Sequence, residues 1–223
     1  MSLMHRTRIK ICGITREQDL ANAVEAGADA LGFVFHPSSK RYVSAARAQE
    51  LCAALPPFVS SVALFVNPQP SFVHEVLDLM SPSILQFHGD ESAEFCSSFG
   101  HPYLKAFRVG APGLETSAEL STQCMSFSSA HGWLFDSYSP LYGGSGHGFD
   151  HSLLTPLRHQ VGARPIVLSG GLNATNVGSA VVSTEPWAVD VSSGVEISPG
   201  VKSTDKMKEF VAAVLQARGN HRF

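Results

Sequence analysis

Residues 8–35 read RIKICGITREQDLANAVEAGADALGFVF, and this stretch decides the fold that the sequence predicts. The runs at 8–12 and 30–35 are rich in β-branched, aromatic and other apolar residues, as buried strands are. Between them, a turn signal is followed by a helical pattern at 16–26. The stretch therefore predicts one strand–helix–strand unit.

The same alternation continues along the chain. Strands are expected at 8–12, 30–35, 61–66, 84–87, 103–108, 133–136, 166–169 and 188–191. Helices are expected at 16–26, 44–54, 71–79, 92–99, 115–125, 151–157, 174–182 and 204–218. Strict alternation favours parallel strands covered by helices, and eight repeats close a barrel more naturally than they extend an open sheet. We expect an α/β fold, a single (β/α)8 (TIM) barrel, with a doubly wound sheet as the alternative.

The chain is expected to form one domain over residues 1–223. Its hydrophobic content of 44% is enough for a sizeable core. No linker, charge block or low-complexity tract divides the sequence. The glycine-rich stretch at 143–148 directly follows a predicted strand, where a functional loop would lie.

Composition favours a small-molecule partner. Sixteen Lys and Arg residues against nineteen Asp and Glu residues give a formal charge of −3 without a basic stripe, which argues against nucleic acid or a membrane surface. The cysteines Cys12, Cys52, Cys96 and Cys124 lack paired spacing, which favours free thiols in a reducing cytoplasm. Neither an export signal nor a membrane-spanning segment is expected. The oligomeric state, monomer or homodimer, stays open.

Three glycine-rich loops follow the predicted strands at 133–136, 166–169 and 188–191. They supply the candidate binding residues Gly144, Ser145, Gly170, Gly171, Ser192, Ser193 and Gly194. Backbone N–H groups in such turns converge on an anion, and barrels favour the last two loops for phosphate. Each loop alone is equally explained as a strand-to-helix turn, but three together favour a phosphate site. The absence of Walker and GxGxxG patterns argues against nucleoside triphosphates and dinucleotides.

Cys12 and Asp136 are the candidate base and acid, because both end predicted strands, where barrel enzymes carry their chemistry. Cys12 is alternatively a small buried apolar residue. Thr15 is expected to cap the next helix and so favour a thiolate, while Lys10 is expected to point to the other face of the strand. Asp136 closes an apolar run, so partial burial is expected to keep it protonated; its alternative role is a helix or turn cap.

Arg41, His88 and a histidine pair are further candidates. Arg41 could grip a planar carboxylate of a substrate with its guanidinium fork, or form a surface salt bridge. His88 could contact substrate or satisfy a loop hydrogen bond. His147 and His151 have the spacing of a metal pair, but glycines disfavour a helix there and no third ligand motif accompanies them. We expect no metal and no other cofactor.

A series of motifs carries a family resemblance over nearly the whole chain. They are KICGIT (10–15), GADALGFVFHPSSKRYVS (27–44), LFVN (64–67), LQFHGDE (85–91), LFDS (134–137), GGSGHGFD (143–150), LSGGLN (168–173) and VDVSSGVEISPGVKSTDKM (189–207). Together they resemble the phosphoribosylanthranilate isomerases of tryptophan biosynthesis, and the first and last motifs are the most specific. The sequence departs from that family at His151, where a Trp is common, and at His147-Gly148, which replaces a variable, often basic, pair.

The resemblance implies an isomerase that turns N-(5′-phosphoribosyl)anthranilate into 1-(2-carboxyphenylamino)-1-deoxyribulose 5-phosphate by an Amadori rearrangement. Asp136 would protonate the furanose ring oxygen, and Cys12, as a thiolate, would remove the proton from C2 of the ribose. Arg41 would pair with the anthranilate carboxylate. Such chemistry requires an acid and a base but no metal or organic cofactor.

Two other functions stay open from the residues alone. Another phosphosugar isomerase or epimerase barrel would share the glycine loops, but metal-dependent epimerases require histidines on the second and third strands. The third strand here ends Phe65-Val66-Asn67. A non-catalytic barrel that binds a phosphorylated ligand would have no use for both Cys12 and Asp136.

Overall fold

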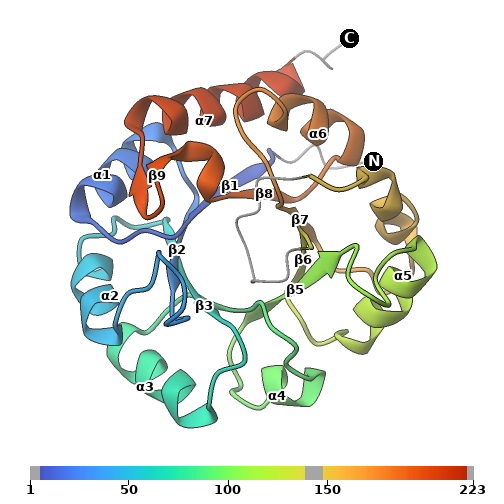
Figure 1. The fold of residues 1–223 in the computed structure, drawn as a ribbon, viewed down its shortest axis with the longest axis horizontal. Helices are drawn as coiled ribbons and strands as arrows, with labels where there is room; N and C mark the ends of the chain where they lie inside the picture. The colour runs from blue at the N-terminus through green and yellow to red at the C-terminus, as the bar shows by residue number, and fades with distance from the viewer. Residues whose placement is uncertain (1–5, 139–147, 220–223) are drawn as a thin grey trace.

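Eight parallel strands close into a barrel, and the helices form a ring outside it (Figure 1). The structure is a computed structural model that describes residues 6–138 and 148–219. The strands are β1 (Arg8–Cys12), β2 (Ala30–Val34), β3 (Ser60–Phe65), β4 (Ile84–Phe87), β5 (Tyr103–Val109), β6 (Gly132–Ser137), β7 (Ile166–Leu168) and β8 (Ala188–Val191). The helices are α1 (Glu17–Ala26), α2 (Ala45–Cys52), α3 (Pro70–Met80), α4 (Ala93–Ser97), α5 (Ser117–Ser126), α6 (Val177–Thr184) and α7 (Thr204–Gly219). The expected TIM barrel is confirmed.

The pairing of β8 with β1 closes the barrel. Arg8 pairs with Ala188 and Ile11 pairs with Val191, in parallel register. A doubly wound sheet would instead leave two edge strands with unpaired backbone groups. Closure therefore removes the alternative fold and brings the ends of the first and last strands together.

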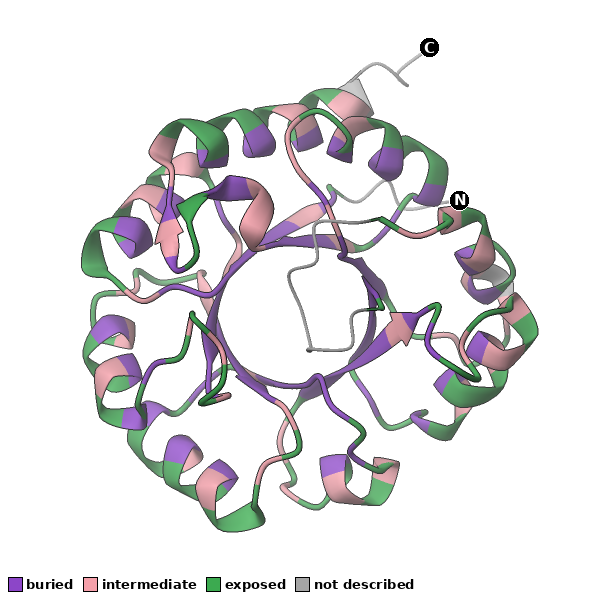
Figure 2. Ribbon diagram, in the orientation of Figure 1, coloured by how far each residue is buried: buried purple, intermediate pink, exposed green. Residues whose placement is uncertain are grey.

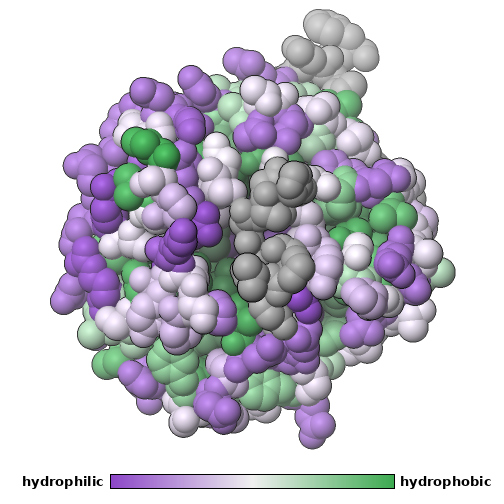
Figure 3. All heavy atoms as spheres, viewed as in Figure 1, coloured by the Kyte–Doolittle hydropathy of each residue, from purple (hydrophilic) through white to green (hydrophobic). Residues whose placement is uncertain are grey.

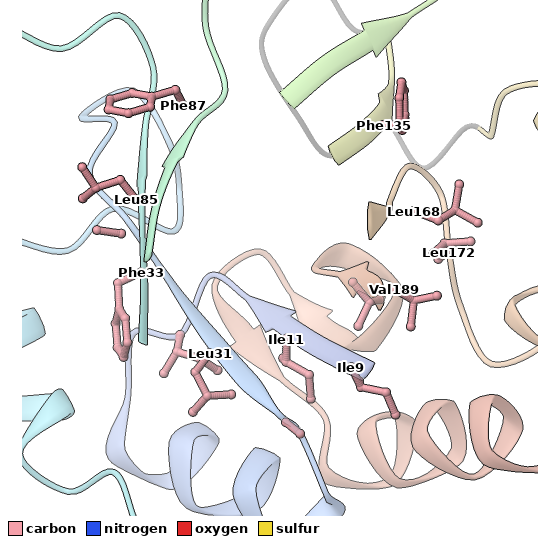
Figure 4. Packing of buried hydrophobic residues seen from close by; sticks show 14 of the residues in the cluster. Ile9, Ile11, Leu31, Phe33, Leu85, Phe87, Phe135, Leu168, Leu172 and Val189 are labelled. Atoms are coloured by element: carbon pink, nitrogen blue, oxygen red, sulfur yellow. The ribbon is translucent and has the colours of Figure 1, made fainter. Parts of the chain in front are cut away.

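Side chains on each strand alternate between the helices and the barrel interior. On β1, Ile9 and Ile11 belong to the large apolar core between barrel and helices (Figure 4). Lys10 points inward, because its Nζ donates to Asp190 Oδ1 on β8 at 2.9 Å. The expectation that Lys10 points away from Cys12 is therefore wrong, since residues two apart on a strand share a face.

The apolar core has two main layers, and the strands are mostly buried (Figure 2). The outer layer lies between strands and helices, and includes large side chains such as Trp133 and Phe87. A smaller cluster inside the barrel contains Leu104, Ala106, Leu134 and Val167. Hydrophilic residues gather over α1 and α2 on the face shown in Figure 3. The barrel interior is thus a packed core that supports the strand ends.

Local signals set the helix ends. The hydroxyl of Ser44 accepts from Arg47 N at the start of α2, and Thr116 and Glu119 form a capping box at the start of α5. The expected helix at 151–157 is wrong. The chain forms two short 3-10 helices there, η1 (His151–Leu154) and η2 (Pro156–His159), because Pro156 has no N–H for a continuous helix.

A small hairpin that the sequence analysis did not predict follows β8. A 3-10 turn, η3 (Ser193–Val195), leads into β9 (Glu196–Ser198), which pairs antiparallel with β10 (Val201–Lys202). Gly200 adopts φ +83 at the turn. The hairpin places Glu196 and Lys202 at the carboxyl end of the barrel. Over the described ranges, no helix has both the length and the apolar character needed to cross a membrane.

Candidate active site

A cavity at the carboxyl ends of the strands brings the candidate catalytic residues together. Its walls combine polar side chains with a few apolar ones. They are Cys12, Val34, His36, Ser39, Arg41, Leu64, Val66, His88, Asp136, Ser169, Asp190 and Ser192. The predicted residues Cys12, Arg41, His88, Asp136 and Ser192 therefore share one cavity, although they come from distant parts of the chain.

Cys12 ends β1 with its sulfur facing into the barrel mouth. The residue is 5% exposed and packs with Val34 and Leu64. Its carbonyl oxygen accepts from Lys202 Nζ at 2.6 Å and from Ser192 Oγ at 3.0 Å, which fixes the end of the strand. Cys12 is thus both buried, as its alternative role requires, and part of the cavity wall.

The N-terminus of α1 does not favour a Cys12 thiolate in the expected way. Arg16, and not Thr15, occupies the position before the first helical residue, and it makes no side-chain cap. The Thr15 hydroxyl instead donates to the carbonyl of Gly200 at 2.9 Å. The expected cap is therefore wrong, because the β9–β10 turn supplies a competing acceptor.

Buried charges surround Cys12 instead. Burial raises the pKa of the Cys12 thiol, and the positive charge of Lys10 opposes this rise. The negative charge of Asp190 raises the pKa further, while Lys202 lowers it, but less than Lys10 does. A raised pKa favours the thiol at neutral pH. The reactivity of the sulfur therefore depends on its neighbouring cations.

Asp136 is the second-last residue of β6 and belongs to a chain of hydrogen-bonded side chains. Its Oδ1 accepts from Ser137 N at 2.8 Å, and its Oδ2 lies 3.1 Å from His88 Nε2. His88 Nδ1 lies 3.0 Å from Gln86 Nε2. Among the described residues, the buried Gln86 Oε1 has no hydrogen-bond partner. Asp136 therefore contacts a histidine whose tautomer depends on the orientation of an amide.

Arg41 reaches the cavity over Gly13 and is held by Glu196. Its Nε and Nη2 donate to the two oxygens of Glu196 at 2.8 and 2.7 Å. Lys202 Nζ donates to the same carboxylate at 2.9 Å. Burial raises the pKa of Glu196, but Arg41 and then Lys202 act more strongly together, so the pKa is lowered. Arg41 is thus a partly buried, charge-paired wall of the cavity.

The glycine loops after β7 and β8 form an adjoining cavity. It is lined by Asp136, Ser137, Ser169, Gly170, Gly171, Leu172, Asp190, Val191, Ser192 and Ser193. The two loops touch, since a Cβ placed on Gly194 would lie 1.9 Å from the carbonyl oxygen of Leu172. Gly170 and Gly171 adopt φ values of +86 and +64, which favour glycine. This cavity shares Asp136, Ser169, Asp190 and Ser192 with the first one.

Some expectations fall on residues that the structure does not describe. Gly144 and Ser145, the candidate binding residues after β6, lie outside the described residues, as does His147 of the histidine pair. Within the described ranges, no group of three or more His, Cys, Asp or Glu side chains could hold a metal ion.

A further cavity of about 300 Å³ lies at the amino end of the barrel. Arg8, Asp29, Phe58 and Trp187 contribute to its lining, and the Arg8 guanidinium lies 3.8 Å above the Trp187 ring. Neither Cys12 nor the glycine loops line it. Barrel enzymes carry their chemistry at the carboxyl ends of the strands. The active site is therefore assigned to the carboxyl-end cavity, although the amino-end cavity is larger.

Sequence reasoning missed several polar residues that face the site. Asp190 and Lys10 lie two residues before Ser192 and Cys12, and Gln86 lies two residues before His88. Strict two-residue alternation from the predicted site residues would have found all three. Glu196 and Lys202 gave no such signal, because they lie on a hairpin outside the barrel repeat.

Comparisons with known proteins identify the family of this chain. Residues 9–213 match the family model described as N-(5′-phosphoribosyl)anthranilate (PRA) isomerase. An N-(5′-phosphoribosyl)anthranilate isomerase of Bordetella petrii is 58% identical over 212 residues, which cover 95% of this chain and 96% of that protein. The family-model match and the alignment with this relative both span the barrel, including the strand ends that line the cavity.

Solved structures give the same result. The crystal structure of phosphoribosylanthranilate isomerase from Thermotoga maritima matches with a TM-score of 0.85 and 41% identity, over 96% of this chain and 99% of that one. A phosphoribosylanthranilate isomerase in complex with reduced 1-(o-carboxyphenylamino)-1-deoxyribulose 5-phosphate matches with a TM-score of 0.81 and 39% identity, over 96% and 99% of the two chains. The chain therefore belongs to the N-(5′-phosphoribosyl)anthranilate isomerase family.

Proposed function

We propose that this protein converts N-(5′-phosphoribosyl)anthranilate into 1-(2-carboxyphenylamino)-1-deoxyribulose 5-phosphate in tryptophan biosynthesis. The observation that carries the proposal is that Cys12 and Asp136 line one cavity, which adjoins the glycine loops after β7 and β8. Membership of the isomerase family supports the reaction class. The relative solved with a reduced product analogue supports a phosphorylated substrate of this kind.

Asp136 acts as the general acid in this proposal. It gives its proton to the furanose ring oxygen, and the ring C–O bond breaks as the anthranilate nitrogen forms a Schiff base with C1. The hydrogen bonds from Ser137 N and with His88 support this role, because they hold the carboxyl group in one orientation at the cavity wall. The reaction leaves Asp136 as a carboxylate.

Cys12 acts as the general base. Its thiolate takes the proton from C2 of the ribose, and the electron pair of that C–H bond moves to neutralise the iminium nitrogen, which gives an enolamine. The enolamine then tautomerises to the ketone. No atom is gained or lost, and no electron acceptor is required, as an isomerisation demands. The position of Cys12 in the same cavity as Asp136 supports the pairing.

The substrate's two anionic ends are proposed to bind on different sides of the pair. Backbone groups of Gly170, Gly171, Ser193 and Gly194 bind the phosphate, together with Ser192 and the residues Gly144 and Ser145 beyond the described ranges. Arg41 pairs with the anthranilate carboxylate. Its guanidinium group has five N–H donors. Glu196 accepts from Nε and Nη2, and the other donors are available to the substrate. His88 orients the acid and faces the substrate.

The four cysteines are all free, which agrees with a cytoplasmic location.

The function is tested by incubating the purified protein with freshly prepared phosphoribosylanthranilate. We expect loss of the anthranilate-type fluorescence and formation of the deoxyribulose phosphate product. Because this product has the same mass as the substrate, it is identified by its chromatographic separation from the substrate and by borohydride reduction of its ketone. A phosphopentose serves as the comparison substrate. Turnover of the phosphopentose without turnover of phosphoribosylanthranilate would favour the other phosphosugar isomerases.

A further inference from the structure

A buried ion pair that the proposed mechanism does not use lies directly beneath Cys12. Lys10 Nζ donates to Asp190 Oδ1 at 2.9 Å, and each side chain is 5% exposed. Removing two charges from water costs several kcal/mol per ion before their attraction offsets it. Buried charge pairs of this kind cluster at functional sites.

Lys10 and Cys12 meet at a gap that Gly32 leaves open. A Cβ placed on Gly32 would lie 2.8 Å from Cys12 Sγ and 3.0 Å from Lys10 Nζ. Gly32 pairs with Cys12 across the β1–β2 register, so the gap lies between neighbouring strands inside the barrel. The missing side chain therefore lets the ammonium group and the sulfur approach the same point.

We propose that Lys10 is a positioning residue whose ammonium group is the counter-ion of the Cys12 thiolate, and that Asp190 keeps this ammonium group charged and oriented. The inference rests on the proposed function in one respect only, namely that Cys12 is the base. When Cys12 ionises, its proton leaves to solvent and Lys10 stays protonated. The negative charge of the sulfur then lies beside a fixed positive charge instead of an apolar wall.

The other charged groups around Cys12 are engaged elsewhere. Lys202 directs its Nζ to the Cys12 carbonyl and to Glu196, and Arg41 directs its fork to Glu196. His36 also lines the cavity. Asp136 lies across the cavity with His88. Among the cations in the described part of the chain that surround Cys12, Lys10 is therefore the one whose ammonium group borders the sulfur.

The pKa directions of the two groups support this arrangement. Burial alone would lower the pKa of Lys10, yet that pKa is raised, first by Asp190 and then by Cys12. Burial raises the pKa of Cys12, and Lys10 is the largest influence that opposes the rise. Lys10 therefore remains a cation where Cys12 needs one.

The test measures the ionisation of Cys12 without substrate, so it does not depend on turnover. The ultraviolet absorbance of the thiolate is titrated against pH for the parent and for each variant. The titration of Cys12→Ser made in the same background is subtracted each time, so that the other cysteines, among them Cys96 near Lys105, cancel. The variants are Lys10→Met and the double variant Lys10→Met/Asp190→Asn, which leaves no unpaired buried charge. The matched control is Lys105→Met, because Lys105 forms an equally buried pair with Glu91 at 2.8 Å.

We expect the thiolate fraction of Cys12, at a fixed pH below its pKa, to fall about 10-fold or more in Lys10→Met, as loss of an adjacent opposite charge predicts. The double variant should show a fall in the same direction and no larger, because it also removes the repulsive carboxylate. Lys105→Met should titrate like the parent. If Lys10→Met does not fold, as judged by circular dichroism, the double variant decides.

An unchanged Cys12 titration in the folded Lys10 variants would overturn the proposal, and so would an equal change in Lys105→Met. The two hypotheses fail separately. A parent protein that does not isomerise phosphoribosylanthranilate contradicts the proposed function, yet it leaves this titration and its interpretation intact. A normal parent turnover with an unmoved Cys12 titration contradicts only the role of Lys10.

Discussion

At the scale of single residues, Arg41 illustrates how a charged side chain is held in one orientation. Glu196 takes both a Nε–H and a Nη2–H from it, which fixes the plane of the guanidinium group. Its stem lies over Gly13, where a Cβ would come within 2.5 Å of Arg41 Cδ. A preset fork loses little conformational entropy when a carboxylate binds to its remaining donors.

We predict that Arg41→Lys raises the KM for phosphoribosylanthranilate. The ammonium group keeps the charge but loses the planar fork, which should cost about 1.5–3 kcal/mol, or roughly 10- to 150-fold. Arg47→Lys is the matched control, because Arg47 pairs with Glu17 and Glu50 on the outer surface of α2. Steady-state kinetics check both variants. Parent-like kinetics in Arg41→Lys would mean that the carboxylate binds elsewhere.

The side chain of His88 makes a second prediction at this scale. If the Gln86 amide is turned, Oε1 instead of Nε2 faces His88 Nδ1, so the oxygen gains the contact that the amide nitrogen gives up. His88 then carries its proton on Nδ1, and Nε2 accepts from a protonated Asp136, which is the form required of an acid. We expect ¹⁵N NMR of the free protein to show the Nδ1–H tautomer of His88. An Nε2–H tautomer would exclude this arrangement.

At the scale of elements, the β9–β10 hairpin supplies the charges that hold Arg41 and the end of β1. Glu196 lies between Arg41 and Lys202, and Lys202 also binds the Cys12 carbonyl. Replacing Glu196 leaves two cations close together in a largely buried place. A short hairpin can therefore influence both the stability of the barrel and the geometry of the site.

We predict that Glu196→Gln lowers the free energy of unfolding by about 3 kcal/mol, as removal of one partner from a buried ion pair typically does. Because the pKa of Glu196 is lowered in the folded state, its stabilising effect is complete above the ordinary value of 4.5 and is lost as the pH falls through the lowered value. Urea unfolding at neutral and acid pH measures both effects.

The matched control is Glu50→Gln, at an exposed pair, which should change the free energy of unfolding by less than about 0.5 kcal/mol. A loss at Glu196 no larger than at Glu50, or a loss that grows at acid pH, would contradict the assignment.

The loops after β7 and β8 form one unit, because Gly194 packs against the backbone of Leu172. We predict that Gly194→Ala separates these loops and weakens binding of the phosphorylated substrate analogue by about 10-fold or more, the loss of roughly one charge-assisted hydrogen bond. Calorimetry with the phosphorylated and dephosphorylated analogues measures the effect. Gly178→Ala, where the nearest atom to a new Cβ is 3.8 Å away, should bind both like the parent. Equal weakening of both analogues by Gly194→Ala would argue against a phosphate site.

At the scale of the whole molecule, the repeat along the sequence predicted the closed barrel and most strand ends within a residue or two. β1, β4 and β8 have the predicted bounds. This succeeded because parallel strands buried on both faces are continuous apolar runs, and the polar residues that interrupt them mark the strand ends. The same logic placed Cys12, Asp136, Arg41 and His88 around one cavity.

What the sequence could not predict depends on contacts between distant segments. The pairing of Lys10 with Asp190 needs β1 and β8 to be neighbours, which only closure of the barrel provides. The capture of Arg41 by Glu196 needs a hairpin too short to show a periodic pattern. The hydroxyl of Thr15 met an acceptor on that same hairpin and left the helix end uncapped. Local propensity carries no information on such long-range competition.

The pairing of Cys12 as base with Asp136 as acid is the central claim, and kcat in two near-isosteric variants tests it most directly. Cys12→Ser and Asp136→Asn should each lower kcat for phosphoribosylanthranilate by at least about 100-fold, the lower end of what a positioned acid or base contributes. Binding of a product analogue and the circular dichroism spectrum should stay close to those of the parent, since shape and packing are kept. If both variants fold and turn over the substrate at nearly the parent rate, Cys12 and Asp136 are not the catalytic pair.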